Sequence, residues 1–239
     1  MHLAHDTIIL AGGVGSRLQR VVGDRPKCLA EINGRPFLAY LLDFLAGAGI
    51  SKVILSTGYK ADQIAQTFGT NYESIQLDYA REEMPLGTGG GLKRALRLSE
   101  QDHVLIFNGD SFTALDLGDY LGWFDSAHMK LGLALTWVED CSRYGRVNCG
   151  DRGEVLEFLE KESDSGGGWI NAGIYLLHRR MLDDFPDDAP FSLERDVFPK
   201  YLGRGVYGKK YQASFIDIGT PSSYEEASRF FSTLSTTNP

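Results

Sequence analysis

The segment Thr7-Ile8-Ile9-Leu10-Ala11-Gly12-Gly13-Val14-Gly15-Ser16-Arg17 joins a short apolar run to a turn with three glycines. The apolar run over 7–10 predicts a short β-strand. Glycine allows the backbone after this strand to approach a ligand closely and to adopt positive φ angles. Main-chain amides in such a turn can surround an anion, and a helix start adds to the favourable field.

Two cations accompany the turn, Arg17 and the lysine of Pro26-Lys27, and they can counter the charge of a polyphosphate. The turn departs from the Walker loop, because Gly15 is followed by Ser16-Arg17 instead of Gly-Lys-Ser/Thr. It also departs from the dinucleotide pattern, which has Gly or Ala at the place of Leu18. The alternative is an ordinary strand-to-helix turn. The two cations favour instead a site for a nucleoside triphosphate.

The composition is that of a globular chain without a basic excess. Its 239 residues are enough for one large α/β domain or two small ones, and 43% of them are apolar, which allows a sizeable core. The net charge of −8 argues against general binding to nucleic acid or to a membrane surface. An anionic substrate must therefore be held by a local group of cations.

The N-terminus and the cysteines indicate where the protein works. The first six residues carry no basic region, no apolar stretch of signal length follows, and no window reaches transmembrane length. Cys28, Cys141 and Cys149 form no CxxC pair, which predicts a reducing compartment and no structural zinc. Cys28 is expected to be a small buried apolar residue. We therefore expect a cytoplasmic protein.

Strand-like and helix-like segments alternate in the first half. Strands are predicted over 7–10, 52–56, 75–79 and 103–107, and helices over 37–48, 61–68 and 91–98. This alternation is typical of a doubly wound α/β sheet, in which ligands lie at the carboxyl ends of the strands. Gly12 and Asp110 both follow such strand ends.

The second half changes character. Strands are predicted over 131–138, 145–148, 155–160 and 173–177, helices over 181–185 and 223–233, and a frayed tail from Ser232 onward. This half is expected to extend the sheet and to form one wall of the cleft. We expect a single domain over 1–239, with a nucleotide-binding half over 1–125 and a second half over 126–231.

The segment from Leu10 to Lys27 resembles the signature of the sugar-1-phosphate nucleotidyltransferases, G-G-x-G-S/T-R-L followed by P-K. Four later motifs match in order, so the resemblance covers nearly the whole chain. It implies the Rossmann-like mixed sheet of the nucleotide-diphospho-sugar transferase type, with a sugar-binding extension. Within this family the chain resembles the D-glycero-D-manno-heptose 1-phosphate guanylyltransferases, which have a similar length. This resemblance implies D-glycero-α-D-manno-heptose 1-phosphate as the sugar and GDP-heptose as the product. The nucleotide-binding residues that the resemblance implies are Leu10, Ala11, Gly12, Gly13, Gly15, Ser16, Arg17, Lys27, Glu82, Pro85, Gly87, Thr88, Asn108 and Gly109.

Two aspartates follow apolar strands and are candidates for a metal site. The strand over 103–107 is followed by Asn108-Gly109-Asp110. In the stretch 214–221, Asp217 likewise follows a short apolar run. Two carboxylates at strand ends can share one hard divalent cation, and Mg²⁺ prefers such oxygen ligands together with water and phosphate. The alternative is that each aspartate caps a turn. In the family the counterpart of Asp110 binds the metal and a counterpart of Asp217 is its usual partner.

A second glycine-rich loop, over 81–91, again opens a helix, and its alternative interpretation is a loose helix start. Similar enzymes for thymidine or uridine nucleotides often carry Gln at the place of Glu82, three residues before Pro85. An ionised Glu82 only accepts hydrogen bonds. Guanine offers N1–H and N2–H₂ side by side, whereas uracil offers one N–H between carbonyls and cytosine one amino group. Glu82 therefore favours GTP, provided that it and not Glu83 points inward.

Three later motifs resemble the sugar-phosphate half of the family site, so the resemblance implies that the half over 126–231 binds the sugar phosphate. They supply Tyr144 with Gly145, Glu160 with Lys161, and Asn171 with Gly173. In the family the Tyr-Gly amide and the glutamate hold sugar hydroxyls, and the lysine approaches the phosphate. The pair Glu160-Lys161 by itself could be a solvated charge run. It also departs from the family, because Glu162-Ser163 follows where proline is usual. Ser192 is expected to cap a helix.

The resemblance implies attack by a sugar 1-phosphate oxygen on the α-phosphorus of GTP, giving a GDP-sugar and pyrophosphate. Arg17, Lys27 and Asp110 would carry catalysis through positioning and electrostatics. The partners are then GTP and a sugar 1-phosphate, with Mg²⁺ as cofactor. The alternatives are a mannose-1-phosphate guanylyltransferase, a uridylyltransferase of the same fold, and a nucleotide-sugar sensor without turnover. The sugar and the oligomeric state stay open, a homodimer included.

Overall fold

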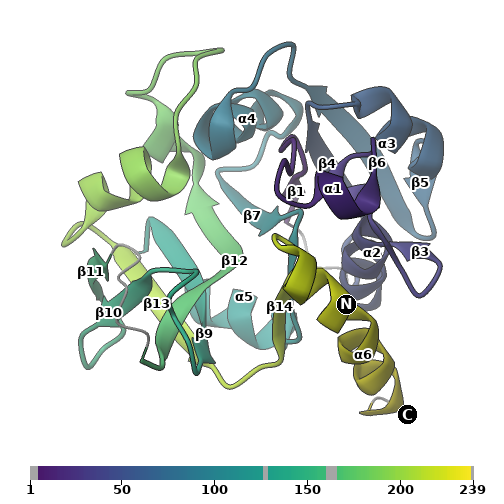
Figure 1. Ribbon diagram of the computed structural model, residues 1–239. Coiled ribbons are helices and arrows are strands. Elements are labelled where there is room, and N and C mark those ends of the chain that lie inside the picture. Colours follow the sequence, from purple (N-terminus) through teal and green to yellow (C-terminus); the bar gives the residue numbers. More distant parts are fainter. Residues whose placement is uncertain (1–4, 126–128, 160–165, 238–239) are drawn as a thin grey trace.

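The computed structural model describes residues 5–125, 129–159 and 166–237 (Figure 1). The α-helices are α1 (Gln19–Val22), α2 (Phe37–Gly47), α3 (Ala61–Phe68), α4 (Gly87–Ala95), α5 (Leu117–Asp125) and α6 (Pro221–Thr237). Short helical turns are η1 (Lys27–Leu29), η2 (Leu96–Leu98), η3 (Arg179–Leu182), η4 (Leu193–Val197) and η5 (Phe198–Tyr201). The strands are β1 (Thr7–Leu10), β2 (Glu31–Ile32), β3 (Arg35–Pro36), β4 (Lys52–Thr57), β5 (Asn71–Tyr72), β6 (Ile75–Arg81), β7 (His103–Asn108), β8 (Ser111–Thr113), β9 (Leu131–Val138), β10 (Arg146–Cys149), β11 (Val155–Leu159), β12 (Gly168–His178), β13 (Val206–Tyr211) and β14 (Phe215–Asp217).

Within the described ranges, ten strands form one sheet. Its main path runs β11-β10-β12-β7-β1-β4-β6-β5, and β9 pairs with both β12 and β13. The strands β7, β1, β4 and β6 are parallel, whereas β12 joins β7 in the antiparallel sense. The pairs β2–β3 and β8–β14 lie outside this sheet. The parallel centre with crossover helices and the antiparallel extension confirm the predicted doubly wound mixed fold.

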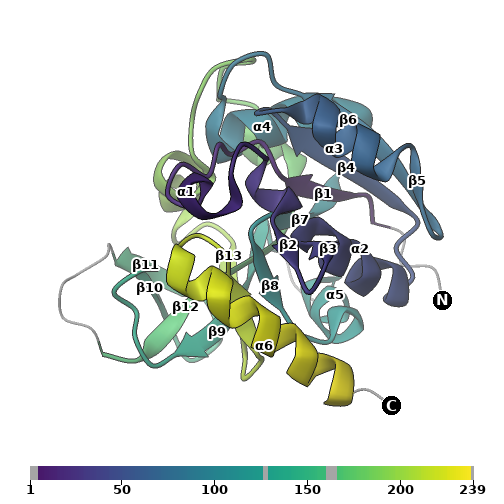
Figure 2. The same cartoon turned by 45° about the vertical axis from the view of Figure 1, so that its right-hand side comes forward.

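Alternate residues of the central strands pack on opposite faces of the sheet, as the period of a strand requires. Ile9 of β1 belongs to a buried cluster with residues of α2, α3, α5 and α6, and Ile8 belongs to a second cluster with residues of α4, η3, η4 and η5. Figures 1 and 2 show α6 running beside α2. The ring of Phe231 in α6 packs edge-on against that of Phe37 in α2, with 6.0 Å between the ring centres. The sheet therefore separates two apolar cores.

The three central parallel strands end at the same edge. Leu10 is level with Ser56 of β4 and with Asn108 of β7. The Ala11 amide donates to the Ser56 carbonyl at 2.8 Å, and the Gly109 amide donates to the Leu10 carbonyl at 2.9 Å. These bonds hold the first glycine-rich turn beside Asp110, so the predicted placement of both at the carboxyl ends is confirmed.

Helix α4 starts earlier than the sequence predicts. It begins at Gly87 rather than at residue 91, because the Gly89 amide donates to the Phe191 carbonyl at 2.9 Å. A Cβ on Gly89 would lie 2.2 Å from the Phe191 ring, so only glycine permits this approach. Tertiary packing thus overrides the low helix propensity of the glycine run.

Other elements also differ from the expectations. The prediction of a frayed tail from Ser232 is wrong, because α6 continues to Thr237. The helix predicted over 181–185 is replaced by the short turn η3, which ends at Leu182. Helix α5 and strand β13 were not predicted.

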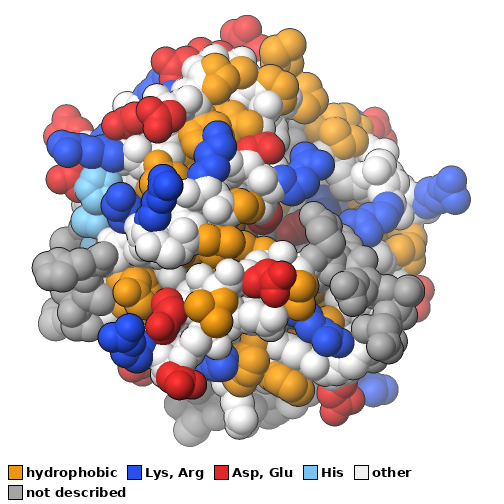
Figure 3. Space-filling model, turned by 90° about the vertical axis from the view of Figure 1, so that its left-hand side faces the viewer, with side chains coloured by type: hydrophobic (Ala, Val, Ile, Leu, Met, Phe, Trp, Pro, Cys, Tyr) orange, Lys and Arg blue, Asp and Glu red, His pale blue; other side chains and the backbone are white. Residues whose placement is uncertain are grey.

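The surface carries charges of both signs. Figure 3 shows basic and acidic side chains interspersed with smaller apolar areas on the left-hand face of Figure 1. Among the residues that the structure describes, no helix is long and apolar enough to cross a membrane.

We expect Gly90→Ala to lower the free energy of unfolding by about 1–3 kcal/mol, through overpacking. Its Cβ would lie 2.4 Å from the Ala189 carbonyl oxygen. Urea denaturation followed by circular dichroism measures the change. Gly122→Ala in α5 is the matched control, because nothing lies within 4 Å of its Cβ and alanine favours helices. A Gly90→Ala variant as stable as Gly122→Ala would contradict the tight contact between α4 and 189–191.

Candidate active site

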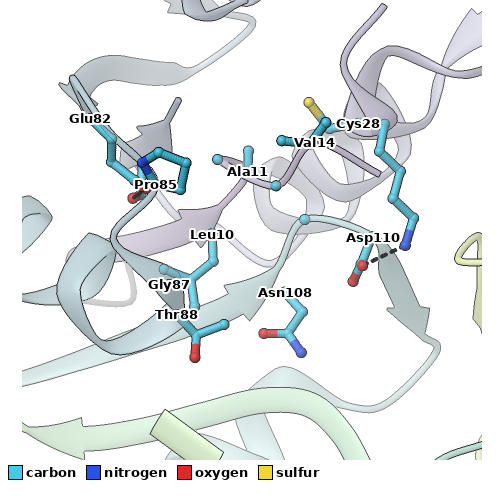
Figure 4. Close-up of a pocket in the computed structure, with 15 residues that line it drawn as sticks. Leu10, Ala11, Val14, Cys28, Glu82, Pro85, Gly87, Thr88, Asn108 and Asp110 are labelled. Atoms are coloured by element: carbon cyan, nitrogen blue, oxygen red, sulfur yellow. Dashed lines mark hydrogen bonds and ion pairs between the residues drawn. The ribbon is translucent and has the colours of Figure 1, made fainter. Parts of the chain in front are cut away.

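The first cavity lies at the carboxyl ends of β1 and β7 and has a volume of about 280 Å³ (Figure 4). It is lined by Leu10, Ala11, Gly12, Gly13, Val14, Lys27, Cys28, Ser56, Glu82, Pro85, Gly87, Thr88, Asn108, Gly109 and Asp110. The structure thus gathers most residues predicted for the nucleotide. Gly15, Ser16 and Arg17 do not line this cavity. Val14, Cys28 and Ser56 were not predicted, although Ser56 could have been found at the end of its predicted strand.

Glu82 points inward and Glu83 is exposed, which meets the condition set by the sequence. One oxygen of the buried Glu82 carboxyl, Oε2, accepts from the Leu86 amide at 2.9 Å, and the other, Oε1, accepts from the Ser56 hydroxyl at 3.2 Å. Burial raises the pKa of Glu82, although these two hydrogen bonds oppose the shift. A carboxylate has about four lone-pair sites, so acceptor capacity is left over for a ligand.

Both glycine-rich loops meet at the Glu82 carboxyl. A Cβ on Gly12 would lie 2.5 Å from Glu82 Oε1, and a Cβ on Gly91 would lie 2.7 Å from the same oxygen. The buried carboxyl is held by Ser56 and Leu86 and has little room to move aside. The two glycines therefore make the space in which Glu82 sits.

Lys27 and Asp110 form an ion pair at the mouth of the cavity. Lys27 Nζ lies 2.6 Å from Asp110 Oδ2, and the side chain of Lys27 is 13% exposed whereas that of Asp110 is 45% exposed (Figure 4). Gly15 has a φ of +65°, and a Cβ there would lie 2.8 Å from Lys27 Cβ. Gly15 thus acts indirectly, by letting the turn pass close to the lysine.

Cys28, beside this lysine, is buried as predicted. Burial raises the pKa of its thiol to about 12, so the thiol stays protonated at neutral pH. Cys28 therefore contributes an apolar wall to the cavity.

Asp217 is held beside Asp110 by the small sheet β8–β14. Asp217 pairs with Ser111, and the Ile218 amide donates to the Asp110 carbonyl at 2.9 Å. The Asp217 carboxylate accepts from the Gly219 amide at 2.7 Å and forms an ion pair with Arg143. In the described part of the chain, no group of three or more His, Cys, Asp or Glu side chains gathers as a metal site. Two carboxylates, one from the turn just before β8 and one from the end of β14, still match the oxygen ligands of Mg²⁺, which fills its remaining positions with water and phosphate.

A second cavity, of about 560 Å³, adjoins the first and shares Lys27, Asn108 and Asp110 with it. Arg17 is exposed and lines this second cavity. The predicted residues Tyr144, Gly145 and Asn171 and the predicted metal ligand Asp217 line it as well. Residues that the sequence did not assign to a site also line it, among them Arg143, Arg146, Tyr175, Ser192, Glu194 and Arg195.

Of the remaining residues predicted for the sugar phosphate, two lie outside the described residues and one lines neither cavity. Glu160 and Lys161 lie outside the described residues. Gly173 lines neither cavity; its φ is +77°, and its amide donates to Asn171 Oδ1 at 2.9 Å. Gly173 therefore orients the Asn171 side chain through the backbone.

The fully buried Tyr175 hydroxyl connects the two cavities. It accepts from Asn171 Nδ2 at 2.9 Å and from Asn108 Nδ2 at 3.2 Å, and it lies 3.5 Å from Glu194 Oε1. Glu194 Oε2 in turn accepts from the Thr88 hydroxyl at 2.7 Å. Burial raises the pKa of Tyr175 well above its ordinary value, so the hydroxyl keeps its proton. Ser192 accepts from the Arg195 amide at 3.3 Å, which is the capping role expected for it.

The chain belongs to the nucleotidyl transferase family, whose profile matches residues 6–233. The relatives are sugar-1-phosphate nucleotidyltransferases, so the class predicted from the motifs is confirmed. The chain is 40% identical over 225 residues to D-glycero-alpha-D-manno-heptose 1-phosphate guanylyltransferase of Aneurinibacillus thermoaerophilus, covering 94% of this chain and 97% of that relative. It is 36% identical to mannose-1-phosphate guanylyltransferase of Mycobacterium tuberculosis, of which it spans 63%.

A solved structure supports the same fold. The crystal structure of HddC from Yersinia pseudotuberculosis has a TM-score of 0.85 and 36% identity to this chain, covering 95% of it and 99% of HddC. A second structure, of HddC complexed with GMP-PN, has a TM-score of 0.84.

We expect Tyr175→Phe to lower the free energy of unfolding by about 1–2 kcal/mol, because two buried side-chain donors lose their acceptor. Chemical denaturation measures the change. Tyr40→Phe is the matched control, since that half-buried hydroxyl lies nearer the surface and donates to the Ile32 carbonyl at 2.9 Å. If Tyr175→Phe cost less stability than Tyr40→Phe, the Tyr175 network would not connect the two cavities as described.

Proposed function

We infer that this protein transfers the guanylyl group of GTP to a sugar 1-phosphate, D-glycero-α-D-manno-heptose 1-phosphate in the first instance, with Mg²⁺. The products are GDP-heptose and pyrophosphate. The observation that carries the inference is the buried Glu82 carboxyl in the first cavity. The 40% identity to a heptose 1-phosphate guanylyltransferase over nearly the whole chain supports the choice of sugar.

The base is selected at Glu82. Its two oxygens keep free lone pairs beside the bonds from Ser56 and Leu86, and these can accept N1–H and N2–H₂ of guanine together. Uracil and thymine would place carbonyl oxygens against a buried carboxylate. Two acceptors facing each other without a donor cost enough binding free energy to discriminate strongly between bases.

The phosphates are assigned to the junction of the two cavities. Lys27 and Asp110 line both cavities, so an α-phosphate held by Lys27 would meet a sugar phosphate that enters from the second cavity. Arg17, on the exposed edge of the second cavity, would neutralise the outer phosphates. Asp110 and Asp217 would hold the metal ion, which supplies positive charge to oppose the repulsion between nucleotide and sugar phosphate.

The nucleophile requires no general base. A phosphomonoester has a second pKa of about 6 and is largely a dianion at neutral pH. The residues of the site therefore serve to position two anions and to balance their charge. Tyr144, Gly145 and Asn171 are assigned to the sugar hydroxyls, together with Glu160, and Lys161 to the sugar phosphate.

The 36% identity to a mannose-1-phosphate guanylyltransferase favours mannose 1-phosphate as the second candidate substrate. Pyrophosphate release with GTP, UTP, CTP and dTTP, each combined with heptose, mannose and glucose 1-phosphates, decides between them. We expect the highest turnover with GTP and the heptose. Highest turnover with mannose 1-phosphate would change the sugar, and highest turnover with UTP would overturn the guanylyl assignment. Binding of GTP without pyrophosphate from any sugar phosphate would indicate a sensor.

We expect Lys27→Ala to abolish turnover while the fold is kept, because the reacting phosphate loses its cation and Asp110 loses its partner. Pyrophosphate release and circular dichroism measure the two effects. Lys52→Ala is the control, since Lys52 begins β4 at the opposite edge of the sheet and pairs with Asp78. Turnover of Lys27→Ala near that of the wild type would disprove the role of Lys27.

We expect Glu82→Gln to reduce kcat/KM for GTP by about 100-fold, because the amide replaces one acceptor with a donor. The ratio of kcat/KM for UTP to kcat/KM for GTP should rise. Glu83→Gln is the matched control, since its exposed side chain carries the same charge one residue away. Comparable losses in both variants would mean that the carboxylate of Glu82 does not read the base.

We expect the KM for GTP to rise on acidification, and to do so at a pH above the ordinary pKa of a glutamate. Burial raises the pKa of Glu82 in the folded protein, so the carboxyl takes up a proton as the pH falls through that raised value and loses its acceptor pair. The free energy of unfolding changes in the opposite sense and rises as the pH falls through the raised pKa of Glu82. The reason is that folding favours the protonated form, so the desolvation cost disappears in acid. Steady-state kinetics against pH measure the profile, and Glu82→Gln should flatten it. The same acid limb in Glu82→Gln would assign the titration to another group.

A further inference from the structure

Arg143, in the turn between β9 and β10, holds the Asp217 carboxylate. Its Nη2 lies 2.7 Å from Oδ1 and 3.0 Å from Oδ2 of Asp217, and 3.3 Å from the Ser223 hydroxyl. The guanidinium also lies 5.1 Å from the centre of the Tyr144 ring. The proposed function gives Arg143 no task, although it lines the second cavity.

The Arg143–Asp217 pair repeats the arrangement of Lys27 and Asp110. Each carboxylate that would hold the metal already has a cation within 2.7 Å, and each cation comes from a different part of the chain. The four groups together are neutral. A divalent cation that enters this neutral group must compete with the two resident cations, and it leaves a net positive charge that a substrate phosphate can balance.

We propose that Arg143 is the resident counter-ion of Asp217 in the substrate-free protein, and that it passes to a phosphate of the sugar 1-phosphate when the divalent cation takes its place. This inference rests on the proposed function. The exchange moves one guanidinium between two oxygen anions and breaks no covalent bond. A planar guanidinium matches a phosphate as well as a carboxylate, so Arg143 keeps a charged partner in both states.

The burial of the two partners fits this exchange. The side chain of Arg143 is 37% exposed, whereas that of Asp217 is 18% exposed and is fixed by the Gly219 amide and the Ser223 hydroxyl. The arginine is therefore the partner that moves, and the carboxylate stays in place. Arg143 thus keeps the affinity for the metal low until a phosphate is present.

Metal binding to the protein alone tests the proposal, with Mn²⁺ as the probe and electron paramagnetic resonance to count free ions. We expect Arg143→Gln to bind Mn²⁺ roughly two- to fivefold more tightly than the wild type, which is the range for a partly exposed ion pair. Arg195→Gln is the matched control, because it removes a positive charge from the same cavity at an exposed residue. We expect a smaller change there. An arginine that only orders Asp217 would give the opposite sign, with weaker Mn²⁺ binding in Arg143→Gln.

A double-mutant cycle assigns the effect to Asp217. In an Asp217→Asn background, Arg143→Gln should no longer tighten Mn²⁺ binding. Unchanged or weaker Mn²⁺ binding in Arg143→Gln overturns the proposal, and so does a gain that persists without Asp217. Arg143→Lys, which keeps the charge, should fall between the wild type and Arg143→Gln. Thermal melting checks that each variant is folded.

Steady-state kinetics test the second half of the exchange. Arg143→Gln should raise the KM for the sugar 1-phosphate and leave that for GTP nearly unchanged. A rise confined to GTP overturns the transfer of Arg143 to the sugar phosphate. Wild-type turnover is the separate check on the proposed function. If the wild type releases pyrophosphate but Arg143→Gln shows no gain in Mn²⁺ affinity, the proposed function stands and this inference is wrong.

Discussion

A buried carboxyl between two glycine-rich loops is the constraint on which the geometry of the first cavity depends. Glu82 needs room that only Gly12 and Gly91 leave, and it needs the Leu86 amide and the Ser56 hydroxyl to compensate for burial. These four partners come from the turn after β1, the end of β4, the residue before α4 and the middle of α4. Holding one carboxyl therefore fixes the positions of both loops. In the proposed function, the same burial would make Glu82 select a base that offers hydrogen-bond donors.

Charge balance governs the junction of the two cavities. Lys27 with Asp110 and Arg143 with Asp217 form two ion pairs at the carboxyl edge of the sheet. Lys27 and Asp217 are the more buried partners, and leaving either charge unpaired would be costly, so each carries an opposite charge beside it. In the proposed function, the same groups would rearrange around phosphates without bringing in charge from elsewhere. The net charge of −8 over the chain is compatible with anionic substrates because the cations are placed locally.

The elements nearest the site were the most predictable from sequence. The apolar runs over 7–10 and 103–107 are short and end in glycine turns, so both the strands and their shared edge follow from local pattern. The early start of α4 could not be predicted, because its glycines form a helix only against Phe191, far away in the chain. Arg143 directly precedes the predicted Tyr144-Gly145 motif, yet its contact with Asp217 bridges more than seventy residues, a separation that no local pattern reports. The Tyr175 network was missed for the same reason.

The placement of guanine against Glu82 is the central claim, and a crystal structure with a non-hydrolysable GTP analogue tests it most directly. The account predicts that the Glu82 oxygens lie about 2.7–3.2 Å from N1 and N2 of the base. It also predicts that the bonds from Leu86 and Ser56 persist. A guanine bound elsewhere in the cavity, with its N1–H and N2–H₂ groups donating to other acceptors, would contradict the account.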